Sequence, residues 1–151
     1  PVNPNTGRCL CGQITFQFES FAGGVAHCHC SMCRRFSGSA FATFGTVNQS
    51  DFQWLSGKDL LKVYPSSEQA ERGFCSHCGS SLFYRLRGKG SSIEIALGAL
   101  DGNPDVNIDA HIYCKNRPDW AEADPELTYD EAALRVTGHE QPSGRIQVGF
   151  P

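Results

Sequence analysis

The chain has 151 residues, 40% of them hydrophobic and 19% charged, with a formal net charge of −3. This length predicts one domain spanning residues 1–151, large enough for its own core, and the composition excludes disordered and collagen-like chains. No apolar run approaches the roughly 18 residues of a membrane span. Residues 1–100 carry 9 basic and 6 acidic residues, and residues 101–151 carry 4 and 10, without any basic block. We therefore expect no membrane or nucleic-acid partner.

The pattern of apolar residues predicts short strands and few helical turns. Ile14, Phe16 and Phe18 alternate along residues 13–18, as in a half-buried strand. Ser31 is placed to cap a short helix that would end at Gly38. Further strands are predicted over 41–44, 60–64, 73–75, 82–86, 93–97 and 111–114, separated by Gly and Ser clusters. The predicted fold class is therefore mostly β, with strands at hairpin spacing.

Cysteine is the unusual component of the composition. Eight are present: Cys9, Cys11, Cys28, Cys30, Cys33, Cys75, Cys78 and Cys114. Seven of them have another cysteine two or three positions away, and thiols this close suit one shared ion. A chain of this size can also fold without disulfides. Zinc is the natural metal because four thiolates hold it tetrahedrally. An iron–sulfur cluster fits less well, because a fourth cysteine at the usual spacing is missing from the central group.

Two of the cysteine pairs together supply the four ligands of a closed, structural zinc site. The pairs are Cys9 with Cys11 and Cys75 with Cys78. Gly12 and Gly79 follow these pairs, and glycine permits the positive φ that turns backbone N–H groups toward sulfur. An ion held by both pairs would join segments that are far apart in the sequence.

The central cysteines Cys28, Cys30 and Cys33 supply only three ligands. Three protein ligands and one open position are typical of catalytic zinc. Three alternatives stay open for the fourth ligand: His27, His29 and Cys114. The three thiols could also be free of metal. We expect the ring of His29 to point away from an ion that Cys28 and Cys30 share.

These motifs resemble those of the glutathione-dependent formaldehyde-activating enzymes, an S-(hydroxymethyl)glutathione synthase-like family that includes centromere protein V. The matching stretches are Gly7–Gly12, Cys28–Gly38, Phe74–Leu82, Gly98–Asp101 and His111–Ile112. The resemblance implies a β-tent fold of twisted antiparallel sheets, shared with methionine sulfoxide reductase B and a Rab-binding exchange factor. It also implies a structural zinc at the four-cysteine set and a second, labile zinc at the three-cysteine set. Cys114 lies outside the family's motif.

The resemblance implies a carbon–sulfur lyase in which glutathione and formaldehyde form S-hydroxymethylglutathione, or the reverse. Cys28, Cys30 and Cys33 would hold a catalytic zinc, on which a fourth thiol is deprotonated. Arg34 and Arg35 follow directly and could pair with the glutathione carboxylates. His111 could shuttle a proton or support the bound ligand. We expect a cytoplasmic enzyme whose partners are a small-molecule thiol and an aldehyde.

Other functions compete with this interpretation. A methionine sulfoxide reductase needs a reactive, metal-free cysteine, and Cys114, the only spare thiol, lies in an apolar stretch where we expect it to be buried. A non-enzymatic zinc-binding chaperone or binding module would need only the structural zinc, so the intact three-cysteine set argues against it. A lyase acting on another thiol adduct is the nearest alternative.

Overall fold

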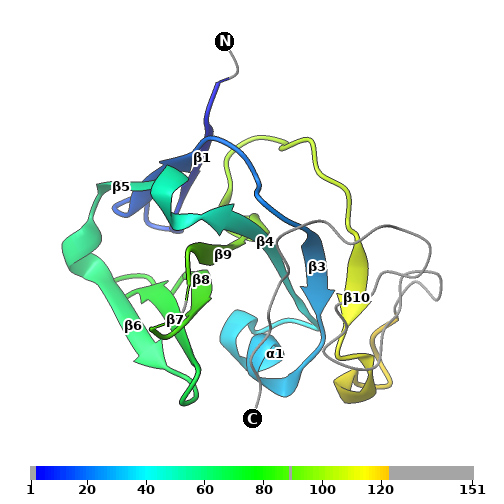
Figure 1. The fold of residues 1–151 in the computed structure, drawn as a ribbon. Coiled ribbons are helices and arrows are strands. Elements are labelled where there is room, and N and C mark those ends of the chain that lie inside the picture. Colours follow the sequence, from blue (N-terminus) through cyan, green and yellow to red (C-terminus); the bar gives the residue numbers. More distant parts are fainter. Residues whose placement is uncertain (1–2, 89, 123–151) are drawn as a thin grey trace.

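The computed structural model describes residues 3–122 apart from residue 89, and within that range it is mostly β (Figure 1). The strands are β1 (Asn5–Arg8), β2 (Thr15–Phe18), β3 (Val25–Cys28), β4 (Ala42–Asn48), β5 (Phe52–Ser56), β6 (Leu61–Pro65), β7 (Ala70–Cys75), β8 (Ser81–Leu86), β9 (Ser92–Ala96) and β10 (Ala110–Ile112). The helix is α1 (Ser31–Ser37), and short 3-10 helices cover Gln49–Asp51, Lys58–Leu60, Leu97–Ala99 and Cys114–Asn116.

The strands form two sheets. A three-stranded antiparallel sheet has the order β1-β2-β5, and a seven-stranded sheet has the order β10-β3-β4-β9-β8-β7-β6. Within the larger sheet only β10 and β3 run parallel. The predicted mostly β, antiparallel β-tent class is therefore confirmed. None of the helices in the described range is long and apolar enough to cross a membrane.

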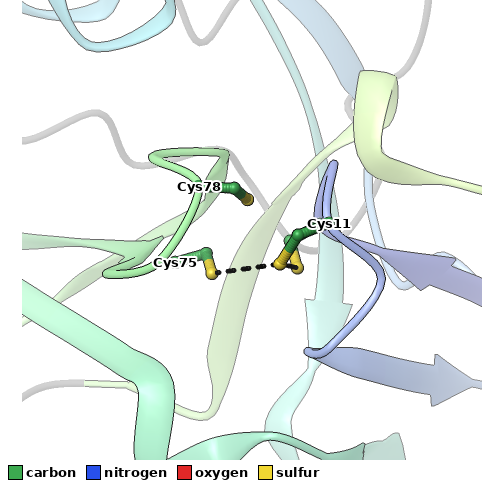
Figure 2. Close-up of side chains that lie close together, drawn as sticks. Cys11, Cys75 and Cys78 are labelled. Carbon is green, nitrogen blue, oxygen red and sulfur yellow. Dashed lines mark hydrogen bonds between the residues drawn. The ribbon is translucent and has the colours of Figure 1, made fainter.

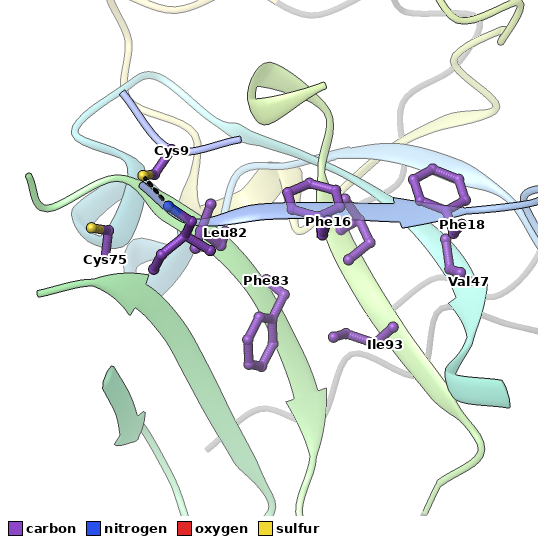
Figure 3. Packing of buried hydrophobic residues seen from close by; sticks show 10 residues of the cluster. Cys9, Phe16, Phe18, Val47, Cys75, Leu82, Phe83 and Ile93 are labelled. Atoms are coloured by element: carbon purple, nitrogen blue, oxygen red, sulfur yellow. Dashed lines mark hydrogen bonds between the residues drawn. The ribbon is translucent and has the colours of Figure 1, made fainter. Parts of the chain in front are cut away.

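The main hydrophobic core lies between the two sheets (Figure 3). Phe16 and Phe18 project from β2 and are at most 1% exposed, which confirms the predicted alternation. They pack with residues that share one face of the larger sheet, including Val47 of β4 and Phe83 of β8. Gly73 of β7 lies opposite Phe83, and a Cβ at Gly73 would overlap the Phe83 ring. Glycine is therefore required there for space rather than for conformation.

The opposite face of the larger sheet carries a second core cluster, which includes the three central cysteines. Helix α1 packs on β4 at this face, and Cys33 is the buried residue of the helix. Phe44 and Tyr84 stack edge to face beneath the helix, with ring centroids 4.9 Å apart. The three central cysteines and helix α1 therefore lie on the face of the larger sheet that is opposite the main core.

The sequence-based boundaries need several corrections. The helix is capped by Cys30 rather than Ser31, because Cys30 Sγ accepts a hydrogen bond from the Cys33 N–H. Its predicted end is confirmed, since Gly38 adopts a left-handed conformation with φ of 64°. The strand over 41–44 continues to Asn48, and the strands β1, β3 and β5 were not predicted. Cys114 begins a 3-10 helix instead of ending a strand.

Candidate metal centres and active site

The four-cysteine set is assembled from two hairpins that belong to different sheets. Cys9 and Cys11 lie in the turn between β1 and β2, whereas Cys75 ends β7 and Cys78 lies in the turn before β8. All four Sγ atoms lie within 4.8 Å of one another, with 3.4 Å between Cys9 and Cys11 and 4.0 Å between Cys11 and Cys75 (Figure 2). A tetrahedral zinc with Zn–S bonds of about 2.3 Å separates its sulfurs by about 3.8 Å. The donors therefore fit zinc, and an ion here would join the two sheets.

Both turns use glycine as the sequence predicts. Gly12 has φ of 77° and Gly79 has φ of 78°. Their N–H groups donate to the carbonyls of Cys9 and Cys75, which closes each turn around its thiols. The Ile14 N–H also donates to Cys9 Sγ at 3.3 Å. The local backbone thus presents the sulfurs to a common centre.

The three-cysteine set lies where β3 meets α1. Cys28 is the last residue of β3, Cys30 caps α1 and Cys33 lies in its first turn, so a short connection gathers three thiols. Their Sγ atoms also lie within 4.8 Å of one another, and all three side chains are at most 4% exposed. No fourth His, Cys, Asp or Glu ligand atom joins this group among the described residues. The chemistry and spacing fit zinc with one open position.

The thiols are electrostatically coupled. Hydrogen bonds from Cys28 and Cys33, together with the Cys33 N–H, lower the pKa of Cys30 to about 3. Hydrogen bonding to the Cys30 sulfur and burial raise the pKa of Cys28 well above its usual range. One thiolate therefore forms readily and the next forms with difficulty unless a cation is bound.

The other candidates for the fourth ligand point elsewhere. His29 is fully buried, and its Nε2 lies 2.9 Å from Nδ1 of His111, so its ring is directed away from the thiols as expected. His27 Nδ1 lies 2.7 Å from the hydroxyl oxygen of Thr43. Cys114 is buried, as expected, and its thiol donates to the carbonyl of His111 at 3.5 Å. These three residues lie outside the thiol group.

His111 belongs to a cluster of imidazoles beside the three-cysteine set. Its partner across the parallel β10–β3 ladder is His27. Because His27 directly precedes Cys28 and successive residues of a strand face opposite sides, the His27 ring and the Cys28 thiol lie on opposite faces of the sheet. Burial lowers the pKa of both His27 and His29 to about 4, so both rings are neutral at pH 7. Because His29 lies between Cys28 and Cys30, its hydrogen bond with His111 anchors the segment that connects these two cysteines.

The two arginines after the cysteines have different surroundings. Arg34 Nε donates to the carbonyl of His29 at 3.2 Å, which ties helix α1 to the ligand-bearing segment. Arg35 is exposed and lines an open groove of about 1340 Å³, with Arg8 on another part of its wall. This groove also borders Cys11 and Cys78, so it extends from α1 to the four-cysteine set.

Two residues that the sequence analysis did not select lie close to the thiols. Arg72 is only 3% exposed, and its Nη1 donates to Cys33 Sγ at 3.6 Å. Tyr113 packs against the second core cluster and is the only described non-glycine residue with positive φ, at 59°. Neither belongs to a cysteine motif. Only the tertiary structure brings them to the site.

Comparison with known proteins decides the family. The model of the glutathione-dependent formaldehyde-activating enzymes matches residues 4–116, which include both cysteine sets. The chain belongs to this family. Both compact thiol groups of the two-sheet fold lie within the residues that this family model matches.

Individual members of the family are distant relatives. The chain is 27% identical over 133 residues to an uncharacterized lyase of Schizosaccharomyces pombe, covering 86% of this chain and 95% of the relative. It is 26% identical over 123 residues to a Halomonas elongata protein named "Putative glutathione-dependent formaldehyde-activating enzyme", covering 77% and 78%. A crystal structure of a Rhodobacter sphaeroides protein superposes with a TM-score of 0.56 at 25% identity, covering 66% of this chain and 91% of that one. Both named relatives are described as enzymes.

Proposed function

We propose that this protein is a zinc-dependent carbon–sulfur lyase that joins glutathione to formaldehyde, or releases formaldehyde from the adduct. The observation that supports this is the buried set of three thiols without a fourth ligand among the described residues. A structural site needs a closed shell, whereas an open position accepts an external ligand. A thiol is the ligand of matching chemistry, because the donors already present are thiolates.

Cys28, Cys30 and Cys33 would hold the zinc, and Cys9, Cys11, Cys75 and Cys78 would hold a structural ion. When bound at the three-cysteine set, zinc supplies a Lewis acid that favours the thiolate form of a fourth sulfur ligand. The helix cap at Cys30 and the buried Cys33 fix two of the donors. The hydrogen-bonded pair of His29 and His111 fixes the intervening segment, and we propose a supporting role of this kind for His111.

Arg34 and Arg35 would orient glutathione through its carboxylates. Both follow Cys33 on α1, and Arg35 lines the open groove beside this helix. An arginine offers a planar pair of donors that matches a carboxylate. Since the Nε of Arg34 is already bonded to the backbone, only its terminal nitrogens would be available to a ligand.

Calorimetric titration of glutathione into the zinc-loaded protein tests the proposal. We expect Cys30→Ser to abolish binding and Arg34→Ala/Arg35→Ala to weaken it by roughly 10- to 150-fold, the range for one charge-assisted hydrogen bond. Arg87→Ala removes an exposed cation whose Nη1 donates to the Ser67 carbonyl, and it should bind like wild type.

S-methylglutathione separates binding through sulfur from binding through the carboxylates alone, because its sulfur carries no proton to lose. We expect at least about tenfold weaker binding of this analogue to wild type. Equal binding of both ligands, or equal binding of glutathione to wild type and Cys30→Ser, would contradict the proposal. The rate of S-hydroxymethylglutathione formation, corrected for the uncatalysed reaction, then tests catalysis.

A further inference from the structure

Arg72 is a buried cation without a carboxylate partner among the described residues. Its side chain projects from β7 beneath helix α1, and the residue is 3% exposed. The guanidinium keeps its charge at every pH a protein encounters. Burial of such a charge is strongly unfavourable unless an anion lies nearby. The surroundings of Arg72 must therefore contain its counter-charge.

The neighbours of Arg72 identify that counter-charge. Its Nε donates to the Ser66 hydroxyl at 3.2 Å, and its guanidinium lies over the rings of Phe36 and Tyr84, at 5.3 and 5.5 Å from their centroids. These three partners are neutral. Its Nη1 donates to Cys33 Sγ at 3.6 Å, so the thiol group is the remaining candidate.

The nearby carboxylates do not supply the charge. Arg72, Tyr84 and Glu94 are cross-strand neighbours on β7, β8 and β9, which separates the backbones of Arg72 and Glu94 by two strand spacings, about 9.5 Å. No ion pair joins the two side chains. Glu71 precedes Arg72, so its side chain faces the other side of the strand, where it accepts a hydrogen bond from Arg85 Nε at 2.7 Å.

We propose that Arg72 is the counter-cation of the three-cysteine set and that its charge determines how tightly this set holds a divalent metal. Three thiolates and a divalent ion carry a net charge of −1, which one guanidinium neutralises. A fourth, external thiolate adds another negative charge, so the buried cation also favours the ligated state. Arg72 acts through Cys33 and is thus a positioning residue rather than a catalytic one. The inference rests on the proposed metal site at Cys28, Cys30 and Cys33.

Cobalt(II) titration tests the inference without substrate. Thiolate-to-cobalt charge-transfer absorption reports each site, and competition with a chelator gives its dissociation constant. We expect Arg72→Met to weaken metal binding at the three-cysteine set by roughly 10- to 150-fold and to leave the four-cysteine set unchanged as an internal reference. Arg72→Lys, which keeps the charge, should stay within about tenfold of wild type. Thermal melting of the metal-loaded variants reports whether each is folded.

Arg85→Met is the matched control. The Arg85 guanidinium also lies over an aromatic ring of this sheet, 5.3 Å from the centroid of Phe83, but its partner is Glu71 rather than a thiol. This variant should bind both metal ions like wild type. Equal loss of affinity in Arg85→Met and Arg72→Met would overturn the inference.

Unchanged affinity in a folded Arg72→Met variant, or a loss in folded Arg72→Lys greater than about tenfold, would also overturn it. The lysine variant alone decides the outcome if the methionine variant does not fold. The same measurements distinguish failure of this inference from failure of the proposed function. Wild type that accepts only one ion refutes both, whereas two ions with the Arg72 effect but no glutathione binding refute only the proposed function.

Discussion

The Thr46 hydroxyl on β4 donates a hydrogen bond to Glu94 Oε2 on the adjacent strand β9, at 2.9 Å between two buried side chains. Glu94 is 4% exposed and forms no ion pair with any described cation. Burial raises the pKa of Glu94 from its ordinary 4.5 to about 7, and the hydrogen bond from Thr46 only partly opposes this. Glu94 is therefore a buried carboxyl group in the middle of the sheet whose pKa lies near pH 7.

The first prediction concerns the pH dependence of stability. Since the folded pKa of Glu94 lies above its unfolded value, the folded state binds the extra proton between about pH 4.5 and 7. The stabilisation of the folded state by this proton is fully present below pH 4.5 and is lost as the pH rises through about 7. Glu94→Gln, which keeps an acceptor for Thr46, should match wild type at pH 4 and exceed it at pH 8 by up to about 3 kcal/mol.

Urea unfolding at both pH values measures this difference. Glu68→Gln is the control, because Glu68 is exposed and the change should have similar small effects at pH 4 and pH 8. If Glu94→Gln shows the same stability difference from wild type at both pH values, Glu94 does not titrate as inferred.

The second prediction concerns the four-cysteine set. Cys78→Ser should lose one metal ion per chain and melt well below wild type, because the free energy of metal binding at a structural site is also folding free energy. Cys114→Ser is the matched control, since Cys114 lies outside both thiol groups and should leave the metal content unchanged. Metal analysis and thermal melting decide the matter. Wild-type melting and metal content in Cys78→Ser would refute a structural role.

The third prediction concerns the difference between the two proposed metal centres. A centre with three protein ligands should exchange its ion more readily than a closed centre with four. Mild chelation should therefore remove about one of two ions while the circular dichroism spectrum stays unchanged. Simultaneous loss of both ions and of structure would contradict this division.

The fourth prediction concerns the core between the sheets. Gly73→Ala should destabilise the protein by roughly 1–3 kcal/mol, because the new Cβ would overlap the Phe83 ring. Gly98→Ala is the control, since open space surrounds the position of its Cβ. Denaturant unfolding measures both. A Gly73→Ala variant as stable as Gly98→Ala would mean that the Phe83 ring can move aside.

Local chemistry made part of the molecule predictable from its sequence. Close spacing brings the thiols of Cys28, Cys30 and Cys33 into one group, and the alternation of Ile14, Phe16 and Phe18 follows directly from the two-residue period of a strand. Glycine at position 38 ends the helix because it adopts the left-handed conformation without steric cost.

Other features were decided only by the tertiary structure. Strand β3 ends in a cysteine and carries a histidine, so its pattern does not indicate a strand, and pairing with β4 and β10 creates it. The sequence directs attention to Arg34 and Arg35, which adjoin the cysteines, whereas the arginine that contacts a thiol is Arg72. It lies 39 positions from Cys33, and only the packing of helix α1 against the sheet brings the two together. The burial of Arg72 and its contact with Cys33, on which its proposed role depends, are set by what the fold places around this residue.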